Sequence, residues 1–111
     1  MKKGERNMLQ KIESVQQFEE LSKEKSRFFF MKHSLTCPIS GNAFEEYQKF
    51  LNSHEEVGYY LAVQESRELS NHIAEKFGIK HESPQAFLFI DGKPGWTASH
   101  WSITEKALNE L

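Results

Sequence analysis

Residues 27–40 read Arg-Phe-Phe-Phe-Met-Lys-His-Ser-Leu-Thr-Cys-Pro-Ile-Ser, and this segment predicts a strand followed closely by a helix. Its first half is aromatic and apolar without helical periodicity, which is typical of a strand buried on both faces. Its second half contains Cys37-Pro38, and proline is favoured at the first position of a helix. A helix over about 38–53 is then predicted by the helical spacing of Phe44, Tyr47, Phe50 and Leu51.

Strand and helix patterns also precede this unit. Residues 8–12 predict a short first strand. Ser14 and Gln17 form a capping-box pattern, because a serine N-cap is followed three residues later by glutamine. We therefore expect an amphipathic helix over about 14–25.

Further elements follow the cysteine-containing unit. Residues 58–63 predict a second buried strand. Gly78 marks the end of a helix, since glycine is favoured just past a helix C-terminus. The apolar positions of that helix are Leu69, Ile73, Ala74 and Phe77.

The C-terminal part of the chain predicts a hairpin and a last helix. Ser83-Pro84 precedes an apolar strand over 86–90, and Asp91-Gly92 is a hairpin signal. The chain then returns through 96–101. The last helix is expected to begin near Ser102, and its apolar positions are Ile103, Ala107, Leu108 and Leu111.

This order of elements predicts an α/β fold. Alternating strands and helices imply parallel strands with right-handed crossovers, and the closing hairpin adds antiparallel edge strands. We expect a mixed sheet of four or five strands with helices on both faces. The expected organisation is a single domain over residues 9–111 after a flexible N-terminal tail, residues 1–8.

Composition and charge exclude several classes of function. The chain has 111 residues, 13% of them aromatic, and a net charge of −2, which argues against a general nucleic-acid binder. The longest apolar runs have five residues, far short of the roughly 20 that span a bilayer. No apolar stretch follows the N-terminal charges, so no signal peptide is predicted. We expect a cytoplasmic protein that binds neither nucleic acid nor membranes.

Cys37 is the most informative residue, because it is the chain's one cysteine and cannot form an internal disulfide or a Cys-rich zinc site. It precedes a predicted helix, whose free amide groups and dipole favour an anion. Such a setting can move a cysteine pKa from about 8.5 into the range of roughly 3.5–7.5. The alternative is an inert buried thiol. The position in a turn between Thr36 and Pro38 favours the reactive interpretation.

The neighbours of Cys37 permit two interpretations each. Ser40 stands where a Cys-x-x-Cys pair has its second thiol, and its hydroxyl can donate a hydrogen bond to a thiolate or simply serve in the first helical turn. His33 could act as a base or an imidazolium partner, or bond to a structural neighbour. His100 lies where the last strand meets the last helix and could face a ligand. No metal-binding spacing is found, and a solvated surface position is expected for His54, His72 and His81.

Three segments together carry a family resemblance: residues 32–40 (KHSLTCPIS), Ser83-Pro84-Gln85 and Ser99-His100-Trp101. With the Asp-Gly hairpin they resemble the thioredoxin superfamily, and more narrowly the YtxJ-like monothiol bacilliredoxins of the bacillithiol redox system in low-GC Gram-positive bacteria. The resemblance covers about residues 9–111. It implies a thioredoxin-like fold and a glutaredoxin-like oxidoreductase activity that removes bacillithiol from protein mixed disulfides under oxidative stress.

The resemblance also implies roles for individual residues. Cys37 matches the family's nucleophile, and Ser40 matches the position of the missing resolving thiol. Supporting positions in the active site are Thr36, Pro38, Ser40 and His33.

On the substrate side, Pro84 matches the superfamily's cis-proline, although most X–Pro bonds in folded proteins are trans. Ser83 would lend backbone hydrogen bonds to an extended substrate. Ser99 and His100 occupy the stretch where related glutaredoxins hold the carboxylates of their thiol cofactor.

The implied partners are bacillithiolated client proteins, with bacillithiol as thiol co-substrate and no metal. Without a second cysteine, a low-molecular-weight thiol or a reductase must regenerate Cys37. A monomer is expected. Two alternatives stay open: a non-catalytic thioredoxin-like adaptor whose thiol is capped under stress, and a monothiol domain that shares an iron–sulfur cluster between two chains. A phosphatase-type Cys-x₅-Arg loop is excluded because residue 43 is Ala.

Overall fold

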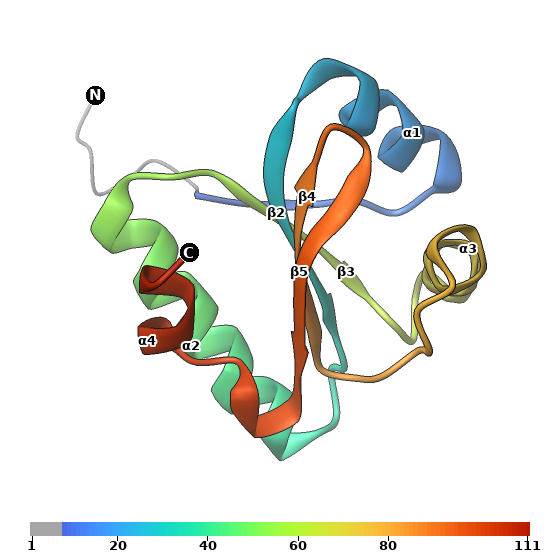
Figure 1. The fold of residues 1–111 in the computed structure, drawn as a ribbon. Coiled ribbons are helices and arrows are strands. Elements are labelled where there is room, and N and C mark those ends of the chain that lie inside the picture. Colours follow the sequence, from blue (N-terminus) through green and yellow to red (C-terminus); the bar gives the residue numbers. More distant parts are fainter. Residues whose placement is uncertain (1–7) are drawn as a thin grey trace, which may run out of the picture.

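The computed structural model describes residues 8–111, which form one five-stranded sheet and four α-helices (Figure 1). In chain order the elements are β1 (Leu9–Lys11), α1 (Val15–Glu24), β2 (Arg27–His33), α2 (Pro38–His54), β3 (Gly58–Ala62), α3 (Arg67–Phe77), β4 (Gln85–Ile90), β5 (Lys93–Ser99), the 3-10 helix η2 (His100–Ser102) and α4 (Glu105–Asn109).

Strand β2 lies in the middle of the sheet, whose strand order is β1-β3-β2-β4-β5. It pairs in parallel with β3 and antiparallel with β4, so the sheet is mixed, as the sequence predicts. The hairpin was expected to supply edge strands, and for β4 this is wrong. Strand β4 lies between β2 and β5 and pairs with both of them in antiparallel fashion. Its central residues, 86–89, are apolar and buried, as is typical of an interior strand covered on both faces.

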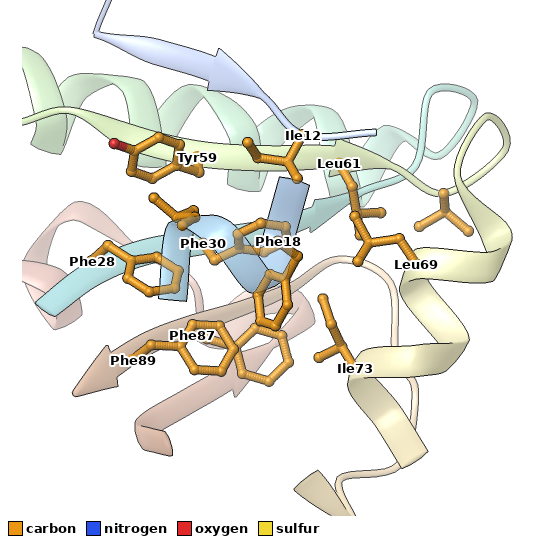
Figure 2. Packing of buried hydrophobic residues seen from close by; sticks show 12 residues of the cluster. Ile12, Phe18, Phe28, Phe30, Tyr59, Leu61, Leu69, Ile73, Phe87 and Phe89 are labelled. Carbon is orange, nitrogen blue, oxygen red and sulfur yellow. The ribbon is translucent and has the colours of Figure 1, made fainter. Parts of the chain in front are cut away.

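Helices α1 and α3 cover one face of the sheet, and α2 and α4 cover the other (Figure 1). Alternating side chains of β2 serve the two faces: Phe28 and Phe30 join the cluster with α1 and α3. Phe18 of α1 inserts among these rings (Figure 2), with its ring centre 5.4 Å from Phe30 and 5.5 Å from Phe89 in edge-to-face geometry. This geometry is favourable for aromatic pairs beyond the area that they bury.

On the other face, Tyr47 of α2 fixes the helix to β3. Its buried hydroxyl donates to the carbonyl of Tyr59 at 2.9 Å and accepts from the amide of Tyr59 at 3.1 Å. Burial raises the pKa of Tyr47 well above its ordinary value, because the phenolate would be desolvated. Gly58 allows this close approach, since a Cβ there would lie 2.5 Å from the Tyr47 hydroxyl.

The first helix follows its predicted signals with one difference. Ser14 caps α1, and its hydroxyl accepts from the amide of Gln17 at 3.1 Å. A complete capping box would return the glutamine side chain to the amide of Ser14. Instead, Gln17 accepts from the amide of Glu13 at 2.7 Å, which satisfies the residue before the cap.

The C-terminal elements differ more from the prediction. Asp91 and Gly92 form the expected turn, with φ of 52° and 80°, but β5 begins at Lys93, directly after it. The last helix does not begin near Ser102. The 3-10 helix η2 occupies His100–Ser102, and Thr104 caps α4 by accepting from the amide of Ala107 at 3.0 Å. A threonine cap that can bond two or three residues ahead therefore sets the start of α4.

The expected N-terminal tail lies outside the described residues except for Met8. Met8 is buried, and its carbonyl accepts from the amide of Gly58 at 2.8 Å, so this residue belongs to the edge of the sheet. Within residues 8–111, no helix combines the length and the apolar character that crossing a membrane requires.

Two glycine substitutions test the packing of α2 on β3. Gly58→Ala places a methyl group against Tyr47 and Leu51, and should lower the free energy of unfolding by about 1–3 kcal/mol. Gly41→Ala is the matched control, because its Cβ meets nothing within 4 Å, and it should raise stability by about 0.5–1 kcal/mol. Urea denaturation followed by circular dichroism measures both, and equal stability of the two variants would contradict this packing.

Candidate active site

One end of the sheet gathers the predicted site segments. Lys32 of β2 pairs with Gln85 of β4, and Gln85 pairs with Ser99 of β5, so β2 and β5 end where β4 begins. The cysteine turn, the segment before β4 and η2 therefore lie together, and Figure 1 shows η2 beside the N-terminal end of α2. The Ser83–Pro84 bond at this end is cis.

Cys37 occupies the N-cap position of α2 in an extended conformation, with φ of −98° and ψ of 121°. Its thiol is free and the residue is half-buried, while its carbonyl accepts from the amide of Gly41 at 3.0 Å. The sulfur makes no capping hydrogen bond to the helix. The sulfur therefore lies at the end of α2 where the first-turn amides lack acceptors inside the helix and where the positive end of the dipole lies.

Ser40 is buried in the first turn of α2, and its hydroxyl contacts residues other than Cys37. The oxygen accepts from the amide of Ser34 at 2.8 Å and lies 2.8 Å from Nδ1 of His33. In the described part of the chain, the hydrogen bond to the Cys37 thiolate that we considered for Ser40 is therefore absent. Ser40 joins the end of β2 to the first turn of α2 and so shapes the cysteine turn.

His33 is the partner of Ser40, and its ring stacks on Phe44 at 4.1 Å between ring centres with an angle of 8°. Burial lowers the pKa of His33 below its ordinary value, because the charged ring would lose hydration. A neutral ring can accept the Ser40 hydroxyl proton at Nδ1. This environment disfavours the imidazolium role that was one possibility for His33.

Gln64 holds the cysteine turn from the other side, and sequence reasoning missed it. Its Oε1 accepts from the amide of Leu35 at 3.0 Å, and its Nε2 donates to the hydroxyl of Ser34 at 2.9 Å. A longer contact of 3.4 Å reaches the hydroxyl of Thr36. The signal available in the sequence was its position just after a strand parallel to β2, because parallel strands end at the same edge.

His100 lies beside the cis peptide bond, at a positive φ of 54°. Its amide donates to the carbonyl of Pro84 at 3.0 Å, and its Nε2 lies 3.3 Å from a carboxylate oxygen of Glu82. The side chain is exposed and so can meet a ligand, but the pairing with Glu82 had no signal in the sequence. The hydroxyl of Ser83 is buried without a hydrogen-bond partner among the described residues.

The family model of the monothiol bacilliredoxin BrxC matches residues 9–108. The chain belongs to the monothiol bacilliredoxin BrxC family. A solved structure of a candidate oxidoreductase with a thioredoxin fold is similar to it, with 45% identity over 93% of this chain and 92% of the other, at a TM-score of 0.90. The oxidoreductase class and the thioredoxin-like fold agree with the expectations from the sequence.

More distant structures show the same fold. Thioredoxin from Fasciola hepatica has 19% identity, covers 91% of this chain and 93% of its own, and gives a TM-score of 0.71. Oxidised mitochondrial thioredoxin 3 from Saccharomyces cerevisiae has 17% identity, with 92% and 91% covered and a TM-score of 0.70. Within residues 8–111 no cluster of three or more His, Cys, Asp or Glu side chains is arranged to hold a metal ion.

A lysine is also buried near the candidate site. Lys32 has no exposed surface, and its ammonium donates to the carbonyl of Ser70 at 2.9 Å and lies 3.2 Å from Nδ1 of His81. Burial lowers the pKa of Lys32 to about 8. His81 is exposed as expected, yet its Nδ1 contacts the buried ammonium, and desolvation and Lys32 both lower the pKa of His81.

The two remaining histidines that were expected at the surface have partners there. His54 contacts Asn109, and His72 contacts Glu19.

Ser40→Ala tests whether this hydroxyl shapes the cysteine turn. The variant leaves the amide of Ser34 and Nδ1 of His33 without their partner, so the free energy of unfolding should fall by about 1–3 kcal/mol. Ser53→Ala removes an exposed hydroxyl and should change it by less than about 0.5 kcal/mol. The rate of alkylation of Cys37 in the folded variant should stay close to that of wild type. A large decrease in this rate without a loss of stability would show that Ser40 acts on the thiol instead.

The buried ammonium predicts a pH dependence of stability. Between about pH 8 and 10.5 the unfolded chain keeps a proton on Lys32 that the folded protein has lost. The free energy of unfolding should therefore rise with pH in this window, by up to about 1.4 kcal/mol per pH unit. Lys32→Met lacks this contribution, so the free energy of unfolding of wild type minus that of the variant should be constant below pH 8 and should become more positive above it. Parallel curves in urea titrations from pH 7 to 10 would refute the assignment.

Proposed function

We propose that this protein is a monothiol thiol–disulfide exchange enzyme that removes bacillithiol from protein mixed disulfides, with Cys37 as the nucleophile. The observation that carries the proposal is the placement of a free, half-buried thiol at the N-cap of a 17-residue helix, in a chain of the monothiol bacilliredoxin family. A thiolate is the attacking species in disulfide exchange, and a helix N-terminus favours it.

The exchange conserves electrons and sulfur–sulfur bonds. The Cys37 thiolate attacks the bacillithiol sulfur of the client's mixed disulfide, a bond forms between these two sulfurs, and the client sulfur leaves as a thiolate that takes a proton from solvent. Because residue 40 is a serine, no second thiol of the chain can displace the adduct. A free low-molecular-weight thiol or a reductase then attacks the bacillithiol sulfur and releases Cys37.

The residues around the thiol supply binding rather than further chemistry. In this proposal the backbone at Ser83 and the cis Pro84 receives the extended substrate, and Thr36 and Pro38 border the sulfur. Ser99 and His100 are the candidates for the carboxylates of bacillithiol, and an anionic ligand there would compete with Glu82 for the His100 ring. We infer a cytoplasmic monomer that meets its clients at this end of the sheet.

Two exposed apolar side chains support a protein substrate. Leu35 is 51% exposed in the cysteine turn, and Trp101 is 65% exposed in η2, which contacts α2. Exposed aromatic and aliphatic groups beside a reactive group mark surfaces that contact other proteins.

Cys37→Ser tests the proposal, because it keeps the size of the side chain and removes the thiol. Wild-type protein incubated with a bacillithiolated client should gain one bacillithiol mass as the client thiol appears, and the variant should do neither. Intact-protein mass spectrometry follows both partners, with the same client carrying glutathione as a comparison of thiol specificity. Client release at an equal rate by Cys37→Ser would overturn the proposal, and a wild type that only binds the client non-covalently would indicate an adaptor.

A further inference from the structure

Two neighbouring strands send buried polar side chains to one short segment of the chain. Lys32 of β2 and Gln85 of β4 stand opposite each other in the antiparallel ladder, so both project from the same face of the sheet. They are 0% and 3% exposed. Gln85 donates to the carbonyl of Lys80 at 3.1 Å and accepts from the amide of Glu82 at 3.3 Å. Lys32 contacts the ring of His81 between them.

A contribution to the stability of the fold does not explain why a lysine occupies position 32. Its ammonium contacts the Ser70 carbonyl and the His81 ring, and both are neutral because the pKa of His81 is lowered. Burying an ammonium without a carboxylate is costly, and an apolar side chain of similar volume serves stability at least as well. Within residues 8–111 no carboxylate pairs with this ammonium, and a buried, unpaired cation next to the candidate site points to a role in function.

The segment that these two side chains hold leads directly into the substrate side of the site. Residues 80–82 precede the cis Ser83–Pro84 bond. The carboxylate of Glu82 and the carbonyl of Pro84 both contact His100, at 3.3 Å and 3.0 Å. A shift of this segment would therefore move the cis peptide bond and His100 together. The cysteine turn has separate supports, Ser40 and Gln64.

We propose that Lys32 and Gln85 are positioning residues that hold residues 80–84 at the correct distance from Cys37 to receive a mixed disulfide. The inference rests on the proposed exchange function and adds that the two halves of the site, the nucleophile and the substrate-binding surface, have separate supports. One set of polar side chains holds the nucleophile, and a second set, reaching up from the sheet, holds the surface that orients the substrate.

If the two supports are separate, substitution of Lys32 should change the reaction rate of Cys37 with a peptide substrate but not with a small alkylating reagent. Lys32→Met replaces the ammonium by an apolar group of similar length and should leave the alkylation of Cys37 by iodoacetamide unchanged, because this reagent needs no contact with residues 80–84. Its rate constant with a bacillithiolated peptide should fall at least about tenfold, since small misplacements of a substrate-orienting group are expensive. Gln85→Met should likewise leave the iodoacetamide rate unchanged and lower the peptide rate. Hydrogen exchange at the amide of Glu82 should become faster in both variants.

Tyr47→Phe is the matched control, because it removes a buried hydrogen-bonding hydroxyl from the opposite face of the sheet. It should lower stability while both rates stay at the wild-type level. If Lys32→Met and Gln85→Met exchange with the peptide as fast as wild type, the positioning role is overturned and the exchange function stands. If their iodoacetamide and peptide rates fall in proportion, the substitutions act on the thiol or the fold, and the positioning role is again overturned. A wild type that reacts with iodoacetamide but not with the peptide overturns both proposals.

Discussion

The antiparallel register between β2 and β4 holds together two segments that are far apart in the chain. With Lys32 opposite Gln85, the turn that follows β2 and the segment that precedes β4 leave the sheet at the same end. A shift of one residue would turn every side chain of β4 to the other face and would remove Phe87 and Phe89 from the aromatic cluster on the face of α1 and α3. The phenylalanines of the two strands therefore fix the register, and through it the approach of Cys37 to the cis Ser83–Pro84 bond.

Polar side chains fix the conformation of the turn that the apolar core brings to this end of the sheet. Ser40 and Gln64 hold the cysteine turn by direct hydrogen bonds to the amides of Ser34 and Leu35. Backbone amides in such turns have no hydrogen-bond partners in the sheet, and side chains that accept from them replace those partners. This arrangement leaves the Cys37 thiol free of structural hydrogen bonds to the helix, and a free thiol at a helix N-terminus suits a nucleophile that must form and break disulfides.

The candidate site could be predicted from the sequence as a set of segments but not as a set of contacts. The cysteine turn, the proline before β4 and His100 do meet at one end of the sheet, because strand order and strand direction bring them there. The partner of Ser40 could not be predicted, since a hydroxyl can bond to any of several neighbours and the geometry of the turn selects His33 and Ser34. Gln64 and Glu82 were missed because single polar residues in loops have no periodic pattern.

The alternation of strands and helices, the aromatic core, the N-cap position of Cys37 and the monothiol family could all be predicted from the amino-acid sequence, because they depend on local periodicity, capping and short motifs. Three features became visible in the folded chain alone: β4 lies inside the sheet, Ser40 bonds to the cysteine turn, and Lys32 is buried beneath residues 80–82. These features depend on pairing between distant strands, where the free energy of burying apolar faces outweighs the preference of a single lysine for water.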